Sequence, residues 1–201
     1  MRSTPTHMPV SSNVSNSGAC LRDHFLLAMP SLNEGLFSHS VTYLCEHGES
    51  GAMGLVINQP LDLSVAEIFE HLKIRPSRDF SDEPVMAGGP VQLDHGFVLH
   101  RGAGKHWDAS LTVTDDITLT TSRDILVAIA DGSGPQEYLI ALGYAGWSAG
   151  QLEEELSRNS WLTVPADSDI LFATPWQRRM SAAAGALGID MNLISAQAGH
   201  A

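Results

Sequence analysis

Apolar runs separated by turn-forming residues divide most of this chain into short strands and helices. Residues 24–29 are largely apolar and stop at Pro30, which predicts a first buried strand. Residues 41–45 and 52–57 predict two more strands, joined by the turn-forming stretch between them. Further short strands are expected at 84–87, 96–100, 111–113, 117–120 and 138–144.

Helical signals are interspersed among these strands. The clearest helix follows Ser64, whose side chain can cap it while Glu67 reaches back to the cap. Its apolar face would be formed by Val65, Ile68, Phe69 and Leu72. A second, short helix is predicted at 124–130, ending at the Asp131-Gly132 pair.

Two more capping boxes predict helices in the last third of the chain. One box pairs Ser148 with Gln151, and the other pairs Thr174 with Gln177. The last helix would bury Trp176, Met180, Ala183 and Leu187 along one face. Strands and helices interleave without a regular βαβ repeat, which favours an α+β domain with a mixed sheet over a doubly wound one.

Composition and charge narrow the class of protein. The chain has 201 residues, 43% of them apolar, which suits one globular domain. No apolar run approaches the roughly 18 residues of a spanning helix, so no membrane association is expected. Twenty-three acidic against eleven basic side chains leave a net charge of −12. Such a surface repels phosphate backbones, and we expect no non-specific nucleic-acid binding.

The N-terminal segment and the cysteines suggest where the protein acts. Residues 1–20 are rich in Ser and lack a signal-peptide core, so we predict a disordered tail before a single domain at 21–201. Cys20 and Cys45 show no metal-binding spacing. A cytoplasmic location therefore fits best. The residues indicate neither a metal nor another cofactor.

Several segments, taken in order, resemble the bacterial AlgH/YqgE family over roughly residues 21–199. The segments that carry the resemblance are FLLAMP at 25–30, SVTYL at 40–44, GAMGLVINQP at 51–60, GGPV at 88–91, GFVLH at 96–100, LGYAGW at 142–147, GQLEEE at 150–155 and NSWL at 159–162. Each is weak alone, but the ordered set is specific. The long Ser-rich start of this chain departs from the family pattern.

The resemblance implies an α+β fold with a bifurcated mixed β-sheet, folded towards a pseudo-barrel and surrounded by helices. It also implies a cytoplasmic bacterial protein without an established biochemical activity. The name AlgH reflects a proposed role in regulating alginate synthesis, so a role in transcriptional regulation rests on the name alone. The family defines no catalytic residues to carry over.

One pentapeptide resembles a catalytic motif. Gly146-Trp147-Ser148-Ala149-Gly150 is a G-x-S-x-G between a predicted strand and a helix, the setting of a hydrolase nucleophile. A triad in that order needs a later histidine, and only His200, next to the chain end, follows. We therefore favour a helix cap for Ser148 over a nucleophile.

Residues 100–106 form a basic island in an acidic chain. His100, Arg101, Lys105 and His106 lie within seven positions, but the residues needed for a P-loop are missing. The segment is either an anion-binding loop or a solvated one. Asp94, His95 and Asp108 add metal-ligand types without a diagnostic spacing, so no metal site is expected.

Two strand ends supply further binding candidates. Asn58 and Gln59 follow one predicted strand, and Gly88 and Gly89 follow another. They could line one pocket, although turn formation and capping of buried backbone is the simpler interpretation.

We therefore predict a non-enzymatic binding or regulatory protein that acts through a small ligand or a protein partner. A serine hydrolase using Ser148 is the alternative. Direct DNA binding is least favoured, because no DNA-binding motif is present and the net charge is unfavourable.

Overall fold

The computed structural model describes residues 20–32, 35–102 and 107–189. Residues 1–19 of the predicted tail lie outside this part. The strands are β1 (His24–Ala28), β2 (Val41–Gly48), β3 (Gly51–Val56), β4 (Pro60–Ser64), β5 (Pro84–Ala87), β6 (Val91–Arg101), β7 (Ser110–Thr112), β8 (Ile117–Thr120), β9 (Tyr138–Ser148) and β10 (Trp161–Pro165). The helices are α1 (Val65–His71), α2 (Arg123–Asp131), α3 (Gln151–Ser157), α4 (Ser168–Phe172) and α5 (Arg179–Gly185), with 3-10 turns η1 (Gly35–Phe37) and η2 (Trp176–Arg178).

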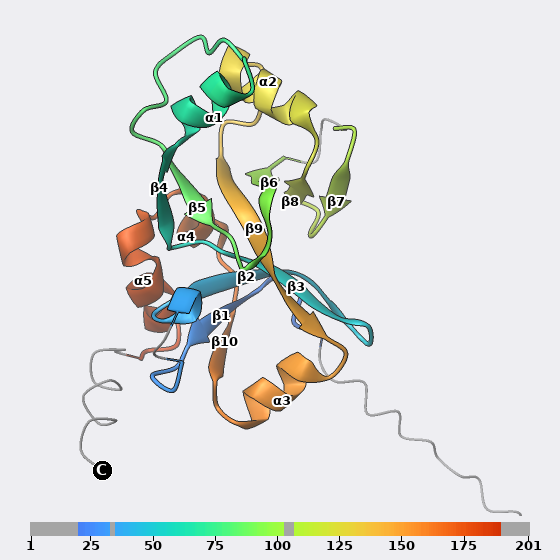
Figure 1. Cartoon of the computed structure of the whole chain (residues 1–201). Helices are drawn as coiled ribbons and strands as arrows, with labels where there is room; N and C mark the ends of the chain where they lie inside the picture. Colours follow the sequence, from blue (N-terminus) through green and yellow to red (C-terminus); the bar gives the residue numbers. More distant parts are fainter. Residues whose placement is uncertain (1–19, 33–34, 103–106, 190–201) are drawn as a thin grey trace, which may run out of the picture.

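These strands form one mixed sheet, and the fold is α+β as predicted. Eight strands follow each other in the antiparallel order β10-β1-β2-β3-β9-β6-β8-β7. A branch of β4 and β5 joins at β9, where β5 runs parallel to β9. In Figure 1, α1 and α2 cover one end of the molecule and α3 the other.

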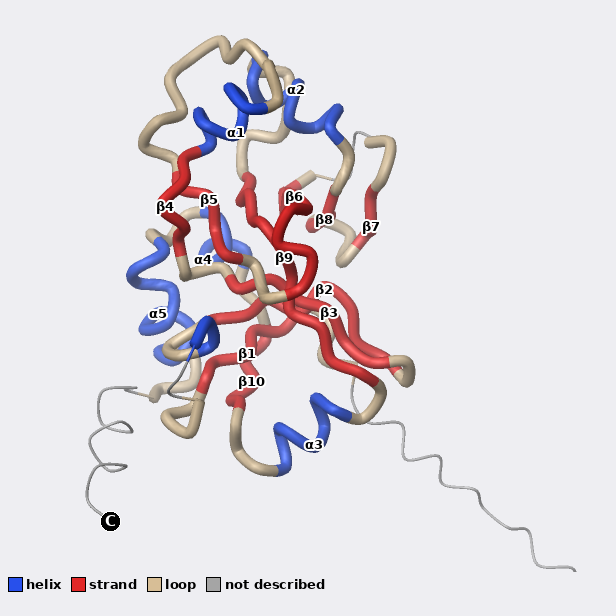
Figure 2. The backbone as a smooth tube through the Cα atoms, viewed as in Figure 1, coloured by secondary structure: helices blue, strands red, loops and turns tan. Residues whose placement is uncertain are grey.

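The bifurcation of the sheet lies at β9, which runs through both halves (Figure 2). One edge of β9 pairs with β6. Along the other edge, residues 145–148 pair with β3, whereas residues 141–142 pair with β5. Gly143, with φ of 70°, lies between these two stretches. One strand thus serves two different partners on the same edge.

Backbone packs directly on backbone at this branch. A Cβ added to Gly88 would lie 2.3 Å from the carbonyl oxygen of Gly143. A Cβ on Gly89 would lie 1.9 Å from the carbonyl carbon of Tyr144. Only glycine fits at either position, because any side chain would push β5 away from β9.

Three apolar clusters fill the spaces around the sheet. The first packs the inner face of the sheet against α4 and α5 and includes Phe25 and Tyr43. The second lies beneath α1 and α2 and contains the perpendicular ring pair Phe69 and Phe80. The third holds α3 against the sheet, where Trp147 and Trp161 both donate their indole N–H to Oε2 of Glu155, at 2.9 and 2.8 Å.

Of the four predicted helices, α1 begins at the predicted cap and α2 ends at the predicted glycine. Ser64 caps α1 with the full reciprocal box, and Gly132 ends α2 in the left-handed conformation. The box at Thr174 and Gln177 is wrong. Thr174 instead donates its hydroxyl to the carbonyl of Asp169 at 3.1 Å, because the unpredicted α4 ends there. Leu187, expected on the buried face, is 42% exposed.

Strand lengths also differ from the expectation. β6 and β9 are longer than the runs 96–100 and 138–144, while β4 and β10 were not predicted. Residues 91–95 of β6 are exposed; residues 91–94 alternate apolar and polar side chains, a short strand pattern that the prediction missed. Within the described ranges, no helix is both long and apolar enough to cross a membrane.

The contact between Gly89 and β9 leads to a first prediction. Gly89→Ala should lower the free energy of unfolding by about 1–3 kcal/mol, because the added methyl group overlaps backbone that cannot move aside. Urea denaturation measures this. The control is Gly48→Ala, since a Cβ on Gly48 meets nothing within 4 Å and should change stability by less than about 0.5 kcal/mol. Equal effects of the two substitutions would contradict the role of the branch.

Candidate binding site

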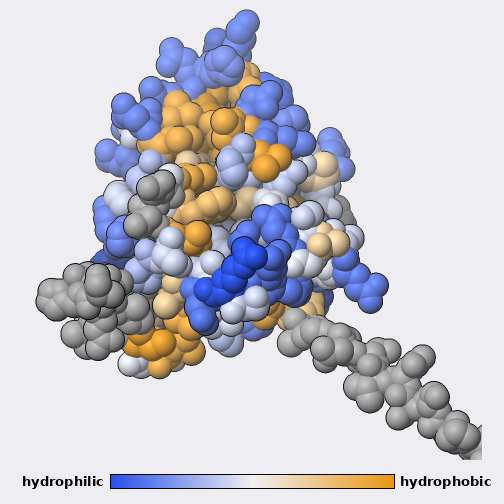
Figure 3. Space-filling view, turned by 60° about the horizontal axis from the view of Figure 1, so that its bottom comes forward, coloured by the Kyte–Doolittle hydropathy of each residue, from blue (hydrophilic) through white to orange (hydrophobic). Residues whose placement is uncertain are grey.

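A cavity of about 780 Å³ opens between α1, α2, β6 and β9. Its apolar lining comes from Leu63, Ile68, Leu72, Gly96, Val98, Leu126, Ile140 and Leu142. Its polar lining comes from Glu67, Glu70, His71, Asp94, Thr121, Ser122 and Arg123. Hydrophobic residues gather in the upper half of the face shown in Figure 3, bordered by hydrophilic ones.

The amphipathic pattern of α1 and α2 creates this cavity. On α1, Val65 and Phe69 are buried in the second cluster, while Ile68 is only partly buried and lines the cavity. On α2, Ile125 is buried and Leu126 lines the cavity. The apolar face of each helix is therefore wider than the core beneath it needs, and part of it remains open to a ligand.

The polar rim of the cavity is mainly acidic. Oε2 of Glu67 accepts from the backbone N–H of Ser64 at 2.8 Å, and this hydrogen bond lowers the Glu67 pKa. Arg123 donates Nη2 to the carbonyl of Leu72 at 2.9 Å. Among the described residues, Glu70 has no ion pair, and Asp94 has only His95 Nδ1, 3.8 Å away. These two carboxylates are available to a ligand.

The four strand-end candidates lie together at the branch of the sheet. Val56 N–H donates to the carbonyl of Gly88, and Ala87 N–H donates to that of Gln59, both at 2.8 Å. Asn58 Oδ1 accepts from Val41 N–H at 2.7 Å, and its Nδ2 donates to the carbonyl of His39 at 2.9 Å.

Gln59, like Asn58, bonds its side-chain amide to the backbone of the segment before β2: its Nε2 donates to the carbonyl of Ser38 at 3.0 Å. The side-chain amides of Asn58 and Gln59 therefore hold the chain before β2. Gly88 and Gly89 provide the close approach to β9.

His100 is part of β6 and is 1% exposed. Its Nε2 shares a hydrogen bond with Thr120 Oγ1 at 3.0 Å, and its Nδ1 has no hydrogen-bond partner among the described residues. Burial lowers the pKa of His100, so the imidazole is neutral near pH 7. Lys105 and His106, predicted in the same basic island, lie outside the described residues.

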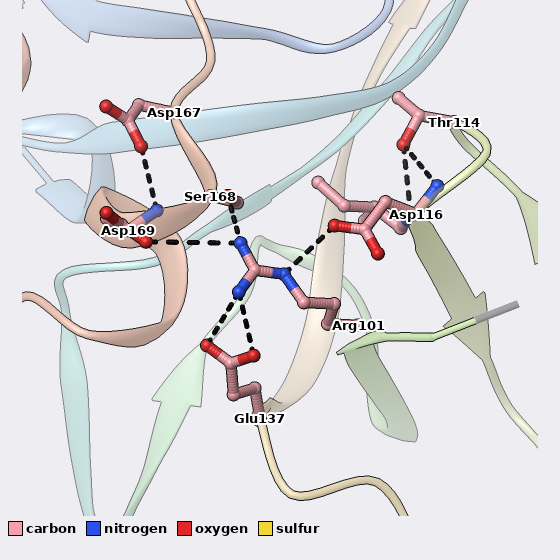
Figure 4. Close-up of polar contacts among 8 residues, drawn as sticks. Arg101, Thr114, Asp116, Glu137, Asp167, Ser168 and Asp169 are labelled. Atoms are coloured by element: carbon pink, nitrogen blue, oxygen red, sulfur yellow. Dashed lines mark hydrogen bonds and ion pairs between the residues drawn. The ribbon is translucent and has the colours of Figure 1, made fainter.

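Arg101, also in β6, lies at the centre of an acidic cluster (Figure 4). Its Nη1 donates to both carboxylate oxygens of Glu137, at 3.0 and 2.8 Å. Its Nε lies 3.0 Å from Asp116 Oδ2, and its Nη2 donates to Ser168 Oγ and lies 4.0 Å from Asp169 Oδ1. The hydrogen bonds to Glu137 raise the Arg101 pKa. An anionic ligand at Arg101 would have to compete with three carboxylates.

Ser148 is the last residue of β9, not a helix cap. Its Oγ and its backbone N–H both donate to Gln151 Oε1, at 3.2 and 3.0 Å. The N-cap of helix α3 is Gly150, which has a φ of 78° and no side chain to cap the helix by a hydrogen bond. The predicted Ser148 cap is therefore wrong. In the part of the chain that the structure describes, no histidine is hydrogen-bonded to Ser148. The described residues also form no cluster suited to a metal ion.

Sequence reasoning missed the cavity between α1 and α2. Its charged residues, such as Glu70 and Asp94, are exposed and look like ordinary solvated surface. The available signal was the apolar stripe on α1 together with Leu126 of α2, which is partly buried against the second cluster and also lines the cavity. No pattern in the sequence shows that α1 and α2 face each other.

Burial of a neutral His100 should make folding sensitive to pH. Its pKa is 6.5 when unfolded and lower when folded, so below pH 6.5 the unfolded chain binds a proton that the folded chain rejects. Stability contributed by this group is present above pH 6.5 and lost as the pH falls towards the folded pKa. The unfolding free energy should therefore fall more between about pH 7.5 and about pH 5.5 in the unmodified protein than in His100→Gln. Identical losses in urea titrations would contradict the burial of a neutral imidazole.

The contacts of Ser148 lead to another prediction. With Gln151 as its hydrogen-bond partner, Ser148 should not react with a fluorophosphonate serine probe. Ser148→Ala should change the unfolding free energy by less than about 1 kcal/mol, because the side chain is exposed. Stoichiometric labelling that disappears in Ser148→Ala would show that the serine is activated.

Comparisons with known proteins identify the family. A family model described as AlgH-like matches residues 25–192. A UPF0301 protein of Saccharophagus degradans is 55% identical over 181 residues, which are 90% of this chain and 89% of the relative. The UPF0301 protein of Thioalkalivibrio sulfidiphilus is 54% identical over 194 residues, 96% of this chain and 100% of the relative.

Two solved structures share the fold. The solution structure of the AlgH protein from Pseudomonas aeruginosa has a TM-score of 0.76 and 52% identity, and the match covers 92% of this chain and 98% of that one. A crystal structure of a Corynebacterium diphtheriae protein has a TM-score of 0.68 at 18% identity, over 91% of this chain and 95% of that one. That second likeness concerns the fold alone. The family match and the relatives show that this chain belongs to the AlgH-like family.

Proposed function

We propose that this protein is a non-enzymatic binding protein that takes a small amphipathic amine into the cavity between α1 and α2. The observation that carries the proposal is an apolar cavity of about 780 Å³ whose rim carries Glu70 and Asp94, neither of which pairs with a lysine or arginine among the described residues. That volume falls in the range of small-molecule sites, which combine an apolar lining with a few polar groups.

The charge of the rim favours a basic ligand. Glu70 and Asp94 offer two carboxylates without a strong cationic partner among the described residues. Arg123 is the fixed cation of the lining, and its guanidinium already donates to a backbone carbonyl. An ammonium group at the rim would meet these carboxylates, while its apolar body would cover Ile68 and Leu126.

A ligand in this position supports a regulatory role. It would contact both α1 and α2 and so favour one spacing of the two helices, which a protein partner could then recognise. We place this role in the cytoplasm, because Cys20 and Cys45 are free thiols, as in a reducing compartment. The net charge of −12 supports a partner other than nucleic acid.

Thermal unfolding with three probes of equal chain length tests this proposal. Octylamine should stabilise the protein saturably, octanol less, and octanoate least, because the rim repels a carboxylate. A probe at 100 times its dissociation constant stabilises the fold by about 2.7 kcal/mol, which gives a clear shift in Tm. Octanoate that stabilises the protein as strongly as octylamine, and loses this shift when Leu126→Trp fills the cavity between α1 and α2, would contradict the proposal.

Two adjacent residues of α2 provide matched variants. Leu126→Trp should fill the cavity and abolish the octylamine shift, whereas Val127→Trp, on a side chain that is 40% exposed, should leave it unchanged. Glu70→Gln combined with Asp94→Asn should remove the preference for the amine over octanol. An unchanged octylamine shift in Leu126→Trp would place binding elsewhere.

A further inference from the structure

A second, smaller cavity of about 250 Å³ lies where β5 and β9 meet the chain between α4 and α5. Its apolar lining includes Pro84, Met86, Phe172, Ala173, Pro175 and Trp176. Its charged groups are Glu83 and Arg179. The volume is suited to a molecule of one or two rings, smaller than the usual drug-sized ligand.

Arg179 is a buried cation with no counter-charge among the described residues. The residue is 7% exposed, and no carboxylate among the described residues lies within ion-pair distance of it. Its Nε donates to the carbonyl of Thr174 at 3.1 Å, and its Nη1 donates to the carbonyl of Ile57. Its Nη2 has no acceptor in the described part of the chain. Burial lowers the Arg179 pKa to about 10.

The carboxylate of Glu83 does not neutralise Arg179, because it is already paired. Its Oε1 lies 2.5 Å from Nη1 of Arg78, and its Oε2 accepts from the hydroxyl of Tyr138 at 2.5 Å. The contrast with Arg101, which three carboxylates surround, is clear. Burying an unpaired guanidinium is unfavourable unless an anion joins it.

We propose that this cavity binds a small organic carboxylate, with the carboxylate paired to Arg179 and an apolar body against Phe172 and Trp176. The Nη2 donors of the planar guanidinium have no acceptor within the described ranges, and guanidinium groups match carboxylates in geometry. The site is separate from the cavity between α1 and α2, and it stands whether or not that cavity binds an amine.

Arg179 also has a structural role, which the test must separate from ligand binding. One of its bonds ties the start of α5 to Thr174, which follows α4, and the other ties it to Ile57, the residue after β3. That role needs no anion, and it would be lost in any variant that removes the guanidinium. A variant that blocks the cavity while keeping Arg179 is therefore required.

Isothermal titration of the full chain with phenylacetate, phenylacetamide and inorganic phosphate tests the ligand chemistry. Phenylacetate should bind saturably at one site, and each of the other two at least about tenfold more weakly. Equal affinity for the amide would show that the protein does not recognise the negative charge of the carboxylate. Equal affinity for phosphate would show that the phenyl ring contributes nothing to binding. Either result, or no binding of phenylacetate, overturns the proposal.

Three variants locate the site. Ala173→Leu enlarges an exposed side chain of the cavity lining and keeps Arg179 in the chain, and Arg179→Lys keeps the charge but loses the planar donors. Both should weaken phenylacetate binding at least about tenfold. Arg178→Gln, at the exposed neighbouring arginine, should bind as the unmodified protein does.

Folding is checked by a cooperative thermal transition in each variant. If Arg179→Lys does not fold, Ala173→Leu decides. Phenylacetate affinity that is unchanged in Ala173→Leu, or lost in Arg178→Gln, overturns the proposal.

Discussion

Direct backbone contact between β5 and β9 is the constraint on which the rest of the structure depends. Gly88 and Gly89 let β5 approach β9 closely, and Gly143 lets β9 pass from one partner strand to another on the same edge. The sheet divides because β3 and β5 share that edge. Each half then needs its own helices to cover its apolar face, and this need separates the three clusters of the core.

Both candidate cavities are consequences of this division. The cavity between α1 and α2 lies over β6 and β9, where two helices cover the sheet but do not close on each other. The cavity at Arg179 lies where the β5–β9 pair meets the last helices. The two cavities therefore suit ligands of opposite charge, because the first has an acidic rim and the second contains the buried cation Arg179.

Local sequence signals were reliable where the interaction they describe is local. The capping box of Ser64 and Glu67 forms as predicted, because both partners lie within one turn of the helix. The box expected at Ser148 forms only in part, because β9 extends through Ser148 to pair with β3 and the chain turns at Gly150 instead. A tertiary pairing thus displaced a local cap. The basic island illustrates the same effect, since β-pairing buries His100 and a carboxylate cluster surrounds Arg101.

The sequence by itself determined the α+β class, most of the buried strands, the α1 cap and the family. Each of these depends on residues that are contiguous in the chain or on motifs in a fixed order. Only the tertiary structure decided the two partners of β9, the unpredicted β4, β10 and α4, and the two cavities. These features depend on residues far apart in the chain, and their burial and charge pairing arise only when the strands meet. Arg178 and Arg179 are adjacent in sequence, yet packing leaves one exposed and buries the other with no carboxylate partner in the part of the chain that the structure describes.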